Sequence, residues 1–338
     1  MFGDILAYSA TAVRSSLGVV VEPGHFLSLG PLLVALAIAL VALRLRSQQR
    51  GRHSAWRHLL AMLFPRRIFL HRSARLDYAI FLINEGLLFF LTLGAIVTPA
   101  VLANVLLDVV GYRTDASGSS GVILAERAIC TLYLVLLWDF GATFAHYLKH
   151  RVPLLWEFHK VHHSAEVLTP VTALRRHPVD SLVGAVMTTF TMGTGMAIWV
   201  LVLQRPPDAI GIFGTVAGIY LWRLLGYNLR HSHVWISYGD FWNSILISPA
   251  QHQVHHSVDP RHYDKNFGHI FACWDRLFGT LYLPAHNERV VFGIEAAEMP
   301  HYRNLYGVYV MPFVKAANLV LRRPQPAPVE VADRTSAD

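Results

Sequence analysis

The sequence has few cysteines and no signature of a haem, a dinucleotide cofactor or an iron–sulfur cluster. Its 338 residues include only two cysteines, Cys130 and Cys273. This number excludes a disulfide framework and a cysteine-ligated iron–sulfur cluster. We also find no dinucleotide fingerprint and no haem-binding domain. Any redox chemistry on this chain would therefore need electrons from a partner.

Charged residues are also scarce. They make up 15% of the chain, whereas 54% of its residues are hydrophobic, which is far more than a soluble core needs. The composition predicts an integral membrane protein. The formal net charge of +7 favours a basic face against anionic lipid headgroups, and we expect no nucleic-acid partner. The first apolar stretch lacks a preceding basic region and a cleavage site, so no cleavable signal is expected.

Long apolar stretches predict an all-α fold with about four to five transmembrane helices. The expected crossings are residues 26–43, the first part of 78–110, 122–145, 181–203 and 209–225. Glu85 and Pro99 interrupt residues 78–110, so the span there is expected to be followed by a reentrant or surface piece. The basic segment 44–75 contains nine arginines and no acidic residue, which predicts a cytoplasmic location. Counting crossings from that segment places residues 146–180 and 226–338 on the cytoplasmic side too.

Three regions follow from this pattern. We expect an N-terminal membrane anchor with a basic cytosolic loop in residues 1–120. Residues 121–285 would form the catalytic region, with a cytosolic helical cap that carries a His-rich di-metal site. Residues 286–338 would form an interfacial helix and a disordered tail.

Histidine is abundant where other polar residues are sparse, with 19 in the chain. Eight of them form three clusters on one predicted side of the membrane: His146 and His150; His159, His162 and His163; His252, His255 and His256. On a helix, residues three and four apart share a face, so each cluster directs its imidazoles toward one point. Without a metal, each unpaired buried donor or acceptor would cost about 1–3 kcal/mol. The clusters therefore predict metal binding.

The number of ligands indicates which kind of metal site this is. One zinc ion takes about four ligands, so most of these imidazoles would not be coordinated to it. Eight or more histidine ligands suit two metal ions of higher coordination number. Imidazole binds iron, copper, nickel and zinc. No Glu sits at a ligand spacing within the clusters, unlike the carboxylate di-iron bundles. Two redox-capable metals at a membrane surface indicate oxygen chemistry on a lipid.

Seven motifs in order resemble the fatty acid hydroxylase and sterol desaturase superfamily, with a tail similar to its alkylglycerol monooxygenase branch. They are HYLKH, FHKVHHS, TALRRHP, NLRHSH, QHQVHH, DKNFG and WDRLFGT, between about Leu132 and Leu283. The resemblance implies a membrane-bound, non-haem di-iron enzyme that uses O2 to hydroxylate or desaturate a lipid. The substrate would enter from the bilayer, and a ferredoxin, cytochrome or reductase would donate electrons.

The same resemblance implies a ligand set. One iron would be held by five histidines: His146, His159, His162, His252 and His255. The other would be held by His150, His163 and His256, completed by a lone histidine. His231 is the first choice for that role, His177 the second and His233 the third.

Carboxylates that orient metal-bound imidazoles are expected nearby. Asp139 is the main candidate, and Asp180, Asp264 and Asp275 are weaker ones. The motif residues Asn266, Gly268, Trp274 and Gly279 are expected to shape the cover of the site. Seven further histidines without a partner spacing are expected at the surface: His53, His58, His71, His262, His269, His286 and His301.

Two other functions remain open on the sequence alone. A membrane zinc-dependent hydrolase could use a His-rich site, although it would normally add a Glu base in a pattern such as HExxH, which is absent. A non-catalytic metal- or haem-binding membrane protein could also use helical histidines. The position of the clusters at the ends of the predicted spans argues against transport.

Overall fold

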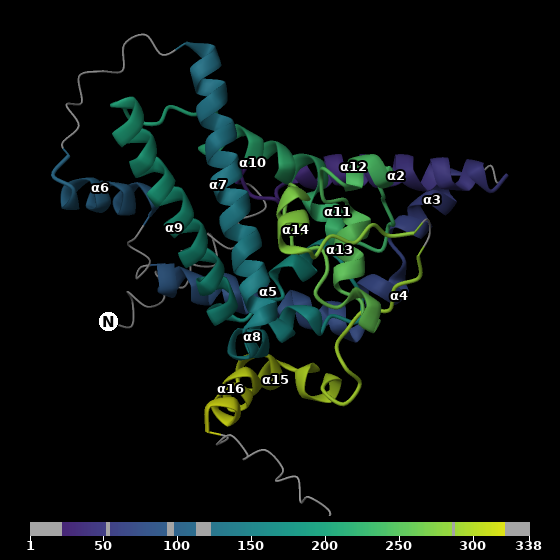
Figure 1. Cartoon of the computed structure of the whole chain (residues 1–338). Coiled ribbons are helices and arrows are strands. Elements are labelled where there is room, and N and C mark those ends of the chain that lie inside the picture. Colours follow the sequence, from purple (N-terminus) through teal and green to yellow (C-terminus); the bar gives the residue numbers. More distant parts are fainter. Residues whose placement is uncertain (1–21, 52–54, 93–97, 113–122, 286–287, 322–338) are drawn as a thin grey trace, which may run out of the picture.

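The secondary structure is almost entirely helical, as the composition predicts. A computed structural model of the chain describes residues 22–51, 55–92, 98–112, 123–285 and 288–321 (Figure 1). Among these residues the only sheet is a two-stranded antiparallel hairpin. The predicted disordered tail beyond Arg323 lies outside the described residues.

Three helices in the described part of the chain are long and apolar enough to cross a membrane. They are α2 (Leu29–Gln49), α7 (Leu124–Arg151) and α9 (Pro178–Leu203). This finding confirms the prediction of a membrane protein. Figure 1 shows α7 and α9 side by side, whereas α2 runs crosswise to them.

Glycines allow the close packing of α7 against α9. A Cβ atom on Gly141 of α7 would lie 2.2 Å from Thr191 Oγ1 and 3.1 Å from Met187 O. A Cβ atom on Gly195 of α9 would lie 2.1 Å from Leu137 Cδ1. Small residues at such contacts let helix backbones approach in a membrane, where the lipid gives no hydrophobic drive for helix association.

The predicted crossing at residues 209–225 is wrong. This stretch forms β1 (Gly211–Ile212), β2 (Thr215–Val216), the short helix α10 (Ala217–Trp222) and a π-helical turn, η2 (Arg223–Tyr227). Phe213 and Gly214 both have positive φ angles, of 48° and 73°, so the backbone turns sharply where a crossing helix would have to continue. The chain then returns along α7, with Val135 of α7 packed against Ile219 of α10.

Residues 78–110, where a span followed by a reentrant or surface piece was expected, contain parts of two helices, α5 (Arg72–Thr92) and α6 (Pro99–Val109). The remaining elements are short, and in Figure 1 most of them lie on the side of α7 where α2 runs or below the C-terminal end of α7. They are α3 (Trp56–Leu63), α4 (Arg66–Phe69), α8 (Pro153–His163), η1 (Pro170–Leu174), α11 (Asn228–Arg230), α12 (Gly239–Asn243), α13 (Pro249–His255), η3 (Pro260–His262), α14 (Cys273–Phe278), η4 (Met299–Tyr302), α15 (Leu305–Tyr309) and α16 (Met311–Leu321).

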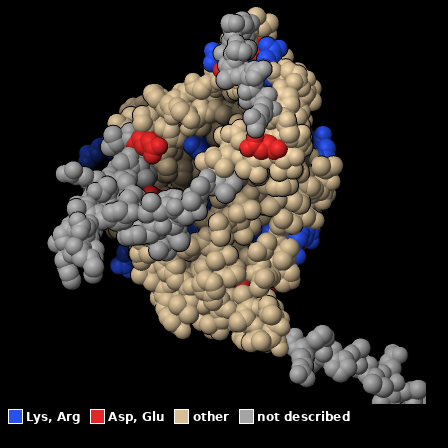
Figure 2. Space-filling view, turned by 90° about the vertical axis from the view of Figure 1, so that its left-hand side faces the viewer, with Lys and Arg blue, Asp and Glu red and all other residues tan. Residues whose placement is uncertain are grey.

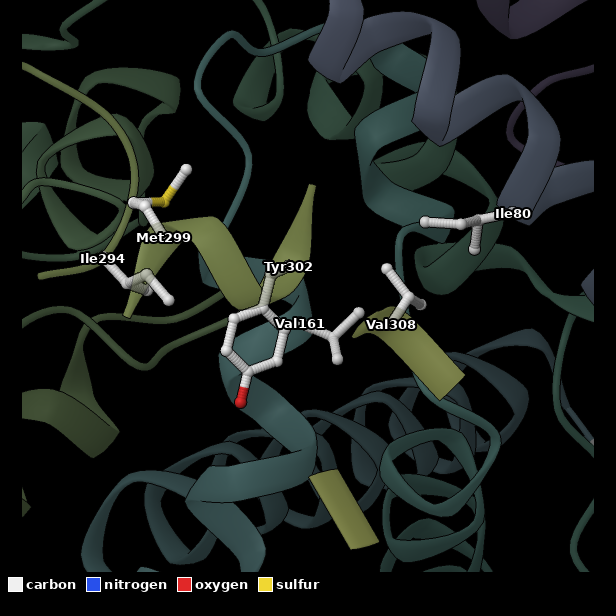
Figure 3. Packing of buried hydrophobic residues seen from close by; sticks show 6 residues of the cluster. All are labelled: Ile80, Val161, Ile294, Met299, Tyr302 and Val308. Carbon is white, nitrogen blue, oxygen red and sulfur yellow. The ribbon is translucent and has the colours of Figure 1, made fainter. Parts of the chain in front are cut away.

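A buried apolar cluster fixes the C-terminal segment to the His-bearing helix α8. It consists of Ile80, Val161, Ile294, Met299, Tyr302 and Val308. Figure 3 shows Tyr302 beside Val161 and Val308. Val161 lies between the ligand candidates on α8, so packing of residues 294–308 holds that helix in place.

A buried ion pair ties the same region to α5. Arg175 Nη1 lies 2.8 Å from Asp77 Oδ1, and both side chains are at most 1% exposed. The Arg175 guanidinium also donates to Val161 O, Ser164 Oγ and Tyr302 O. One side chain thus joins α5, α8 and the C-terminal segment.

Candidate metal centre

Nine histidines converge into two neighbouring groups. The first imidazole group contains His146, His150, His159, His163 and His255. The second imidazole group contains His162, His231, His252 and His256. Within each group, one ring nitrogen of every member lies within 4.8 Å of the others, and every ring except that of His150 is buried.

In the second group the Nε2 atoms point at one another. The distances between successive Nε2 atoms are 3.2 Å from His162 to His231, 2.9 Å from His231 to His252 and 3.2 Å from His252 to His256. A neutral imidazole carries only one N–H, so hydrogen bonds cannot satisfy all of these contacts well. Nitrogens that bind one metal at about 2.1 Å lie roughly 3 Å apart, so the spacing suits a cation at the centre.

In the first group, outward hydrogen bonds fix the rings. Nδ1 of His146 lies 2.9 Å from Phe267 O, Nδ1 of His255 lies 2.7 Å from Lys265 O, and Nδ1 of His159 lies 2.7 Å from Asp180 Oδ1. Carbonyl and carboxylate oxygens accept, so each Nδ1 carries the proton and each Nε2 keeps its lone pair. The Nε2 atoms of these three histidines are buried without a partner. They are therefore available to a metal.

Burial keeps these imidazoles neutral. The pKa values of His159, His163 and His255 lie well below the ordinary 6.5, first because burial disfavours the cation and then because neighbouring imidazoles would repel it. The pKa values of His231 and His252 are lowered by burial and then by the charge of Arg230. Neutral imidazole is the form that binds a metal.

Each HxxHH box is divided between the two groups. On α8, His159 and His163 face the first group and His162 faces the second. The box on α13 is used the other way, with His252 and His256 in the second group and His255 in the first. Residues i and i+4 share a helix face, whereas i+3 points about one sixth of a turn away from i. The two helices α8 and α13 can thus each supply histidines to both groups.

A search of protein-family models places residues 131–280 in the family described as fatty acid hydroxylase. This segment is therefore similar to the fatty acid hydroxylase family, over somewhat less than half of the chain. It contains all nine converging histidines. No solved structure matches the chain.

Curated relatives of the fatty acid hydroxylase segment act on lipids according to their names. Human alkylglycerol monooxygenase is 29% identical over 156 residues, which cover 46% of this chain and 31% of that protein. An ornithine lipid hydroxylase of Rhizobium tropici is 29% identical over 160 residues, which cover 47% of this chain and 44% of that protein. A very-long-chain aldehyde decarbonylase of Oryza sativa is 27% identical over 194 residues, which cover 54% of this chain and 70% of that protein. The matched part spans only about a third of the alkylglycerol monooxygenases.

Of the ten predicted ligands, His177 is the one that the structure does not bring into either group. Its Nδ1 accepts from Val179 N at the start of α9, and its Nε2 lies 3.3 Å from Tyr309 O. Both ring nitrogens are therefore engaged in capping and tethering. His233, the third choice, also lies elsewhere, with its Nε2 2.9 Å from Met62 O. His231 lies in the second group.

The predicted division of ligands between two metals also differs from the observed grouping. The resemblance implied that His162 and His252 share a metal with His146, His159 and His255, whereas they lie in the second group with His231 and His256. Conversely, His150 and His163 lie in the first group. Only the three-dimensional placement of the helices could decide this, because each HxxHH box contributes to both groups.

The main carboxylate candidate, Asp139, does not contact a ligand histidine through its carboxylate. It accepts from Ile270 N, Phe271 N and Trp274 Nε1 at 2.7, 3.0 and 2.8 Å. It therefore anchors the DKNFG–WDRLFGT loop to α7. Asp180, ranked lower on sequence, lies 2.7 Å from Nδ1 of the ligand candidate His159, and Asp264 lies 3.6 Å from Nδ1 of His150.

Asp275 has a similar structural role in that loop. It accepts from Phe267 N, Gly268 N and Thr280 Oγ1 at 2.7, 2.8 and 2.6 Å. Phe267 supplies the carbonyl that fixes His146. The DKNFG motif thus acts through backbone carbonyls, a role that side-chain chemistry alone did not indicate.

Two residues beside the groups were not identified from sequence. Arg230 is 3% exposed, and its Nη2 donates to His252 Nδ1 and to Gly268 O, each at 2.8 Å. A neutral His252 that accepts this bond carries its proton on Nε2, so binding of a metal through Nε2 would require the other tautomer and the loss of this bond. His269, expected at the surface, lies with its ring 5.8 Å from that of His146. His262 is likewise buried, 2.9 Å from Glu288 Oε1.

Two cavities reach the groups from different directions. A cavity of about 290 Å³ is lined by residues of α7, α9 and η2 and touches both groups, through His146 and His159 of the first and His162, His231 and His252 of the second. A second cavity of about 360 Å³ touches His150, His163 and His255 of the first group and is bordered by Asp264, Glu295 and Glu298. The first lies between two candidate membrane spans, whereas the second borders the C-terminal segment.

Proposed function

We propose that this protein is an O2-dependent membrane lipid hydroxylase, or a desaturase, that holds two iron ions in its two imidazole groups. The observation that carries the proposal is the convergence of nine imidazoles on two points within a fatty acid hydroxylase segment. The activities named for the relatives support a lipid substrate.

The donor set fits iron. Five imidazoles in one group and four in the other exceed the three protein ligands of a catalytic zinc. Imidazole suits iron, and bound iron would supply the activation of O2 that attack on an unactivated C–H bond requires. We assign the first group to one ion and the second group to the other.

The residues of the chain position the ligands and exclude water. Asp180, Phe267 O and Lys265 O hold the protons of three imidazoles outward, so that their lone pairs face inward. Burial of the rings keeps competing water away from the site. The lipid chain would enter laterally between α7 and α9, through the first cavity.

Electrons would come from a separate protein, such as a ferredoxin, a cytochrome or a reductase, because the sequence contains no group that could supply them. The arginine-rich segment before α5 favours a cytoplasmic location for the imidazole groups.

Metal analysis tests this proposal directly. The full chain is purified in detergent from iron-supplemented cells, and bound metals are counted. We expect about two irons per chain, a large loss in His162→Ala and in His255→Ala, and no loss in His177→Ala or His233→Ala, which remove buried or half-buried histidines outside the groups.

The competing functions give different results in the same measurement. One zinc and no iron, even after anaerobic reconstitution with iron, would favour the hydrolase. No tightly bound metal in a folded preparation would contradict the proposal altogether.

A further inference from the structure

The first cavity is unusually cationic for a space between membrane helices. Four cations and one carboxylate line it: Lys149, Arg176, Arg223 and Arg230 against Asp180. On the face shown in Figure 2 the surface is hollowed, and Lys or Arg atoms lie inside the hollow. Cationic groups beside apolar walls attract an anion far more strongly than they would in water.

Two of the four cations already have partners that use their charge. Lys149 Nζ lies 3.0 Å from Asp180 Oδ1. Arg230 is almost fully buried and donates to Gly268 O, His269 O and His252 Nδ1. These two side chains belong to the support of the imidazole groups.

Arg176 and Arg223 are different. Neither forms an ion pair with any residue that the structure describes, and each makes one hydrogen bond, from Arg176 Nη2 to Tyr227 Oη at 3.3 Å and from Arg223 Nη1 to Gly24 O at 3.0 Å. A guanidinium has five N–H donors in a fork that matches an oxyanion. Both side chains are half-buried and line the cavity, so they retain donors and charge for a ligand.

The position of Arg176 places such a ligand close to the imidazole groups. Its partner Tyr227 has its ring 6.5 Å from that of His231, and η2 also carries Arg223 one turn earlier. The rest of the lining includes the small or apolar residues Ala142, Ala145 and Ala185 of the two candidate spans. The cavity therefore joins a cationic end to an apolar wall.

We infer that the substrate is an anionic lipid, with a carboxylate or phosphate bound by Arg176 and Arg223 and the adjoining carbons held beside the imidazole groups. This inference rests on the proposed function, because it takes the first cavity to be the site where the lipid substrate binds. A neutral lipid would leave the remaining donors of both guanidiniums partly desolvated and without hydrogen-bond acceptors, which is unfavourable.

Binding of lipids with one common acyl chain tests the inference. The metal-loaded full chain in a neutral detergent is titrated with oleic acid, oleoyl lysophosphatidic acid and monooleoylglycerol, and dissociation constants are measured. We expect at least one anionic lipid to bind about tenfold more tightly than monooleoylglycerol. Preference for the acid alone identifies a carboxylate, and preference for the phosphate lipid identifies a phosphate.

Substitutions assign the preference to the two arginines. We expect Arg176→Gln and Arg223→Gln each to reduce anionic binding about five- to tenfold without changing the binding of monooleoylglycerol. Arg176→Lys and Arg223→Lys should retain part of the preference and serve if a Gln variant does not fold. Arg205→Gln, which removes a cation outside the cavity, should have no effect.

Equal affinity of the wild type for all three lipids would overturn the inference, as would an equal loss in Arg205→Gln. The metal content of each preparation is measured in parallel. Absence of iron would count against the proposed function, whereas absence of anion selectivity in an iron-loaded protein counts only against the lipid class.

Discussion

At the scale of single residues, the carboxylate of Asp180 determines which nitrogen of His159 faces the first imidazole group. It lies 2.7 Å from His159 Nδ1 and 3.0 Å from Lys149 Nζ. The sequence places it at the start of α9, next to Pro178, where it resembles an ordinary first-turn acidic residue. Its contact with α8 arises only because α9 begins beside the end of α7.

Asp180→Asn should weaken iron binding by about 10- to 100-fold, because a neutral amide no longer holds the proton of His159 outward as strongly. Iron affinity is measured by competition with a chelator. Asp208→Asn is the control, since Asp208 is 50% exposed, pairs with Arg127 and belongs to neither imidazole group. An equal loss in both variants would contradict the specific role of Asp180.

Arg175→Met should lower the free energy of unfolding by about 3–5 kcal/mol, since it leaves the buried carboxylate of Asp77 without its cation. Thermal unfolding of the metal-free protein in detergent measures the effect. The double variant Asp77→Leu/Arg175→Met should recover part of the loss, because it removes the unpaired charge. Arg72→Met, which breaks the exposed pair with Glu166, should leave the unfolding temperature unchanged. A stable Arg175→Met protein would show that this pair does not hold α5 to α8.

At the scale of secondary-structure elements, the close approach of α7 and α9 positions the ligands at the end of α7. His146 and His150 lie about one and a half and two and a half turns beyond Gly141, whose Cβ position is blocked by Thr191 Oγ1 and backbone atoms of α9. The spacing of the histidines could be predicted from sequence. The glycine contact could not, because an isolated glycine in an apolar helix has no partner that a pattern can identify.

Gly141→Ala should separate α7 from α9 and destabilise the protein by about 1–3 kcal/mol. We expect a lower unfolding temperature together with lower iron occupancy. Gly30→Ala in α2 is the matched control, because its Cβ would meet nothing within 4 Å and alanine favours the helix. If Gly141→Ala behaves like Gly30→Ala, close contact between the two helices is not required.

At the scale of the whole molecule, burial of so many neutral imidazoles makes stability depend on pH. The pKa values of His159, His162, His163, His231, His252, His255 and His256 all lie well below 6.5 in the folded chain. In the unfolded chain these groups take up protons below about pH 6.5. The unfolded state therefore binds more protons, and folding stability falls as pH falls through that value.

The metal-free protein should thus lose more than about 5 °C of its unfolding temperature between pH 7.5 and pH 5.5. Thermal scans in detergent at constant ionic strength measure the change. A variant in which His162 and His256 are both replaced by Gln should show a shallower dependence, because fewer groups take up protons on unfolding. An unfolding temperature that stays constant or rises as pH falls would contradict the neutral burial of these rings.

Composition predicted the membrane character and the helical class, and helical spacing predicted eight of the nine converging imidazoles. The resemblance of the motifs indicated the family and His231. All of these are local properties of the sequence. Two predictions from the sequence, a crossing at residues 209–225 and a metal ligand at His177, differ from the structure, and the reasons are local as well. Ala209–Leu225 is as apolar as a span, but positive φ angles at Phe213 and Gly214 turn the chain. His177 matched a motif, but it caps α9 and contacts Tyr309.

Only the tertiary structure decided how the ligands divide and what supports them. His162 and His163 are adjacent in sequence and still face different groups, since successive residues of a helix point about 100° apart. The partners of the outward nitrogens, Asp180, Phe267 O, Lys265 O and Arg230, come from segments up to 121 residues away from the histidines they hold. Such contacts depend on how whole helices pack, and this packing cannot be predicted from the spacing of residues in the sequence.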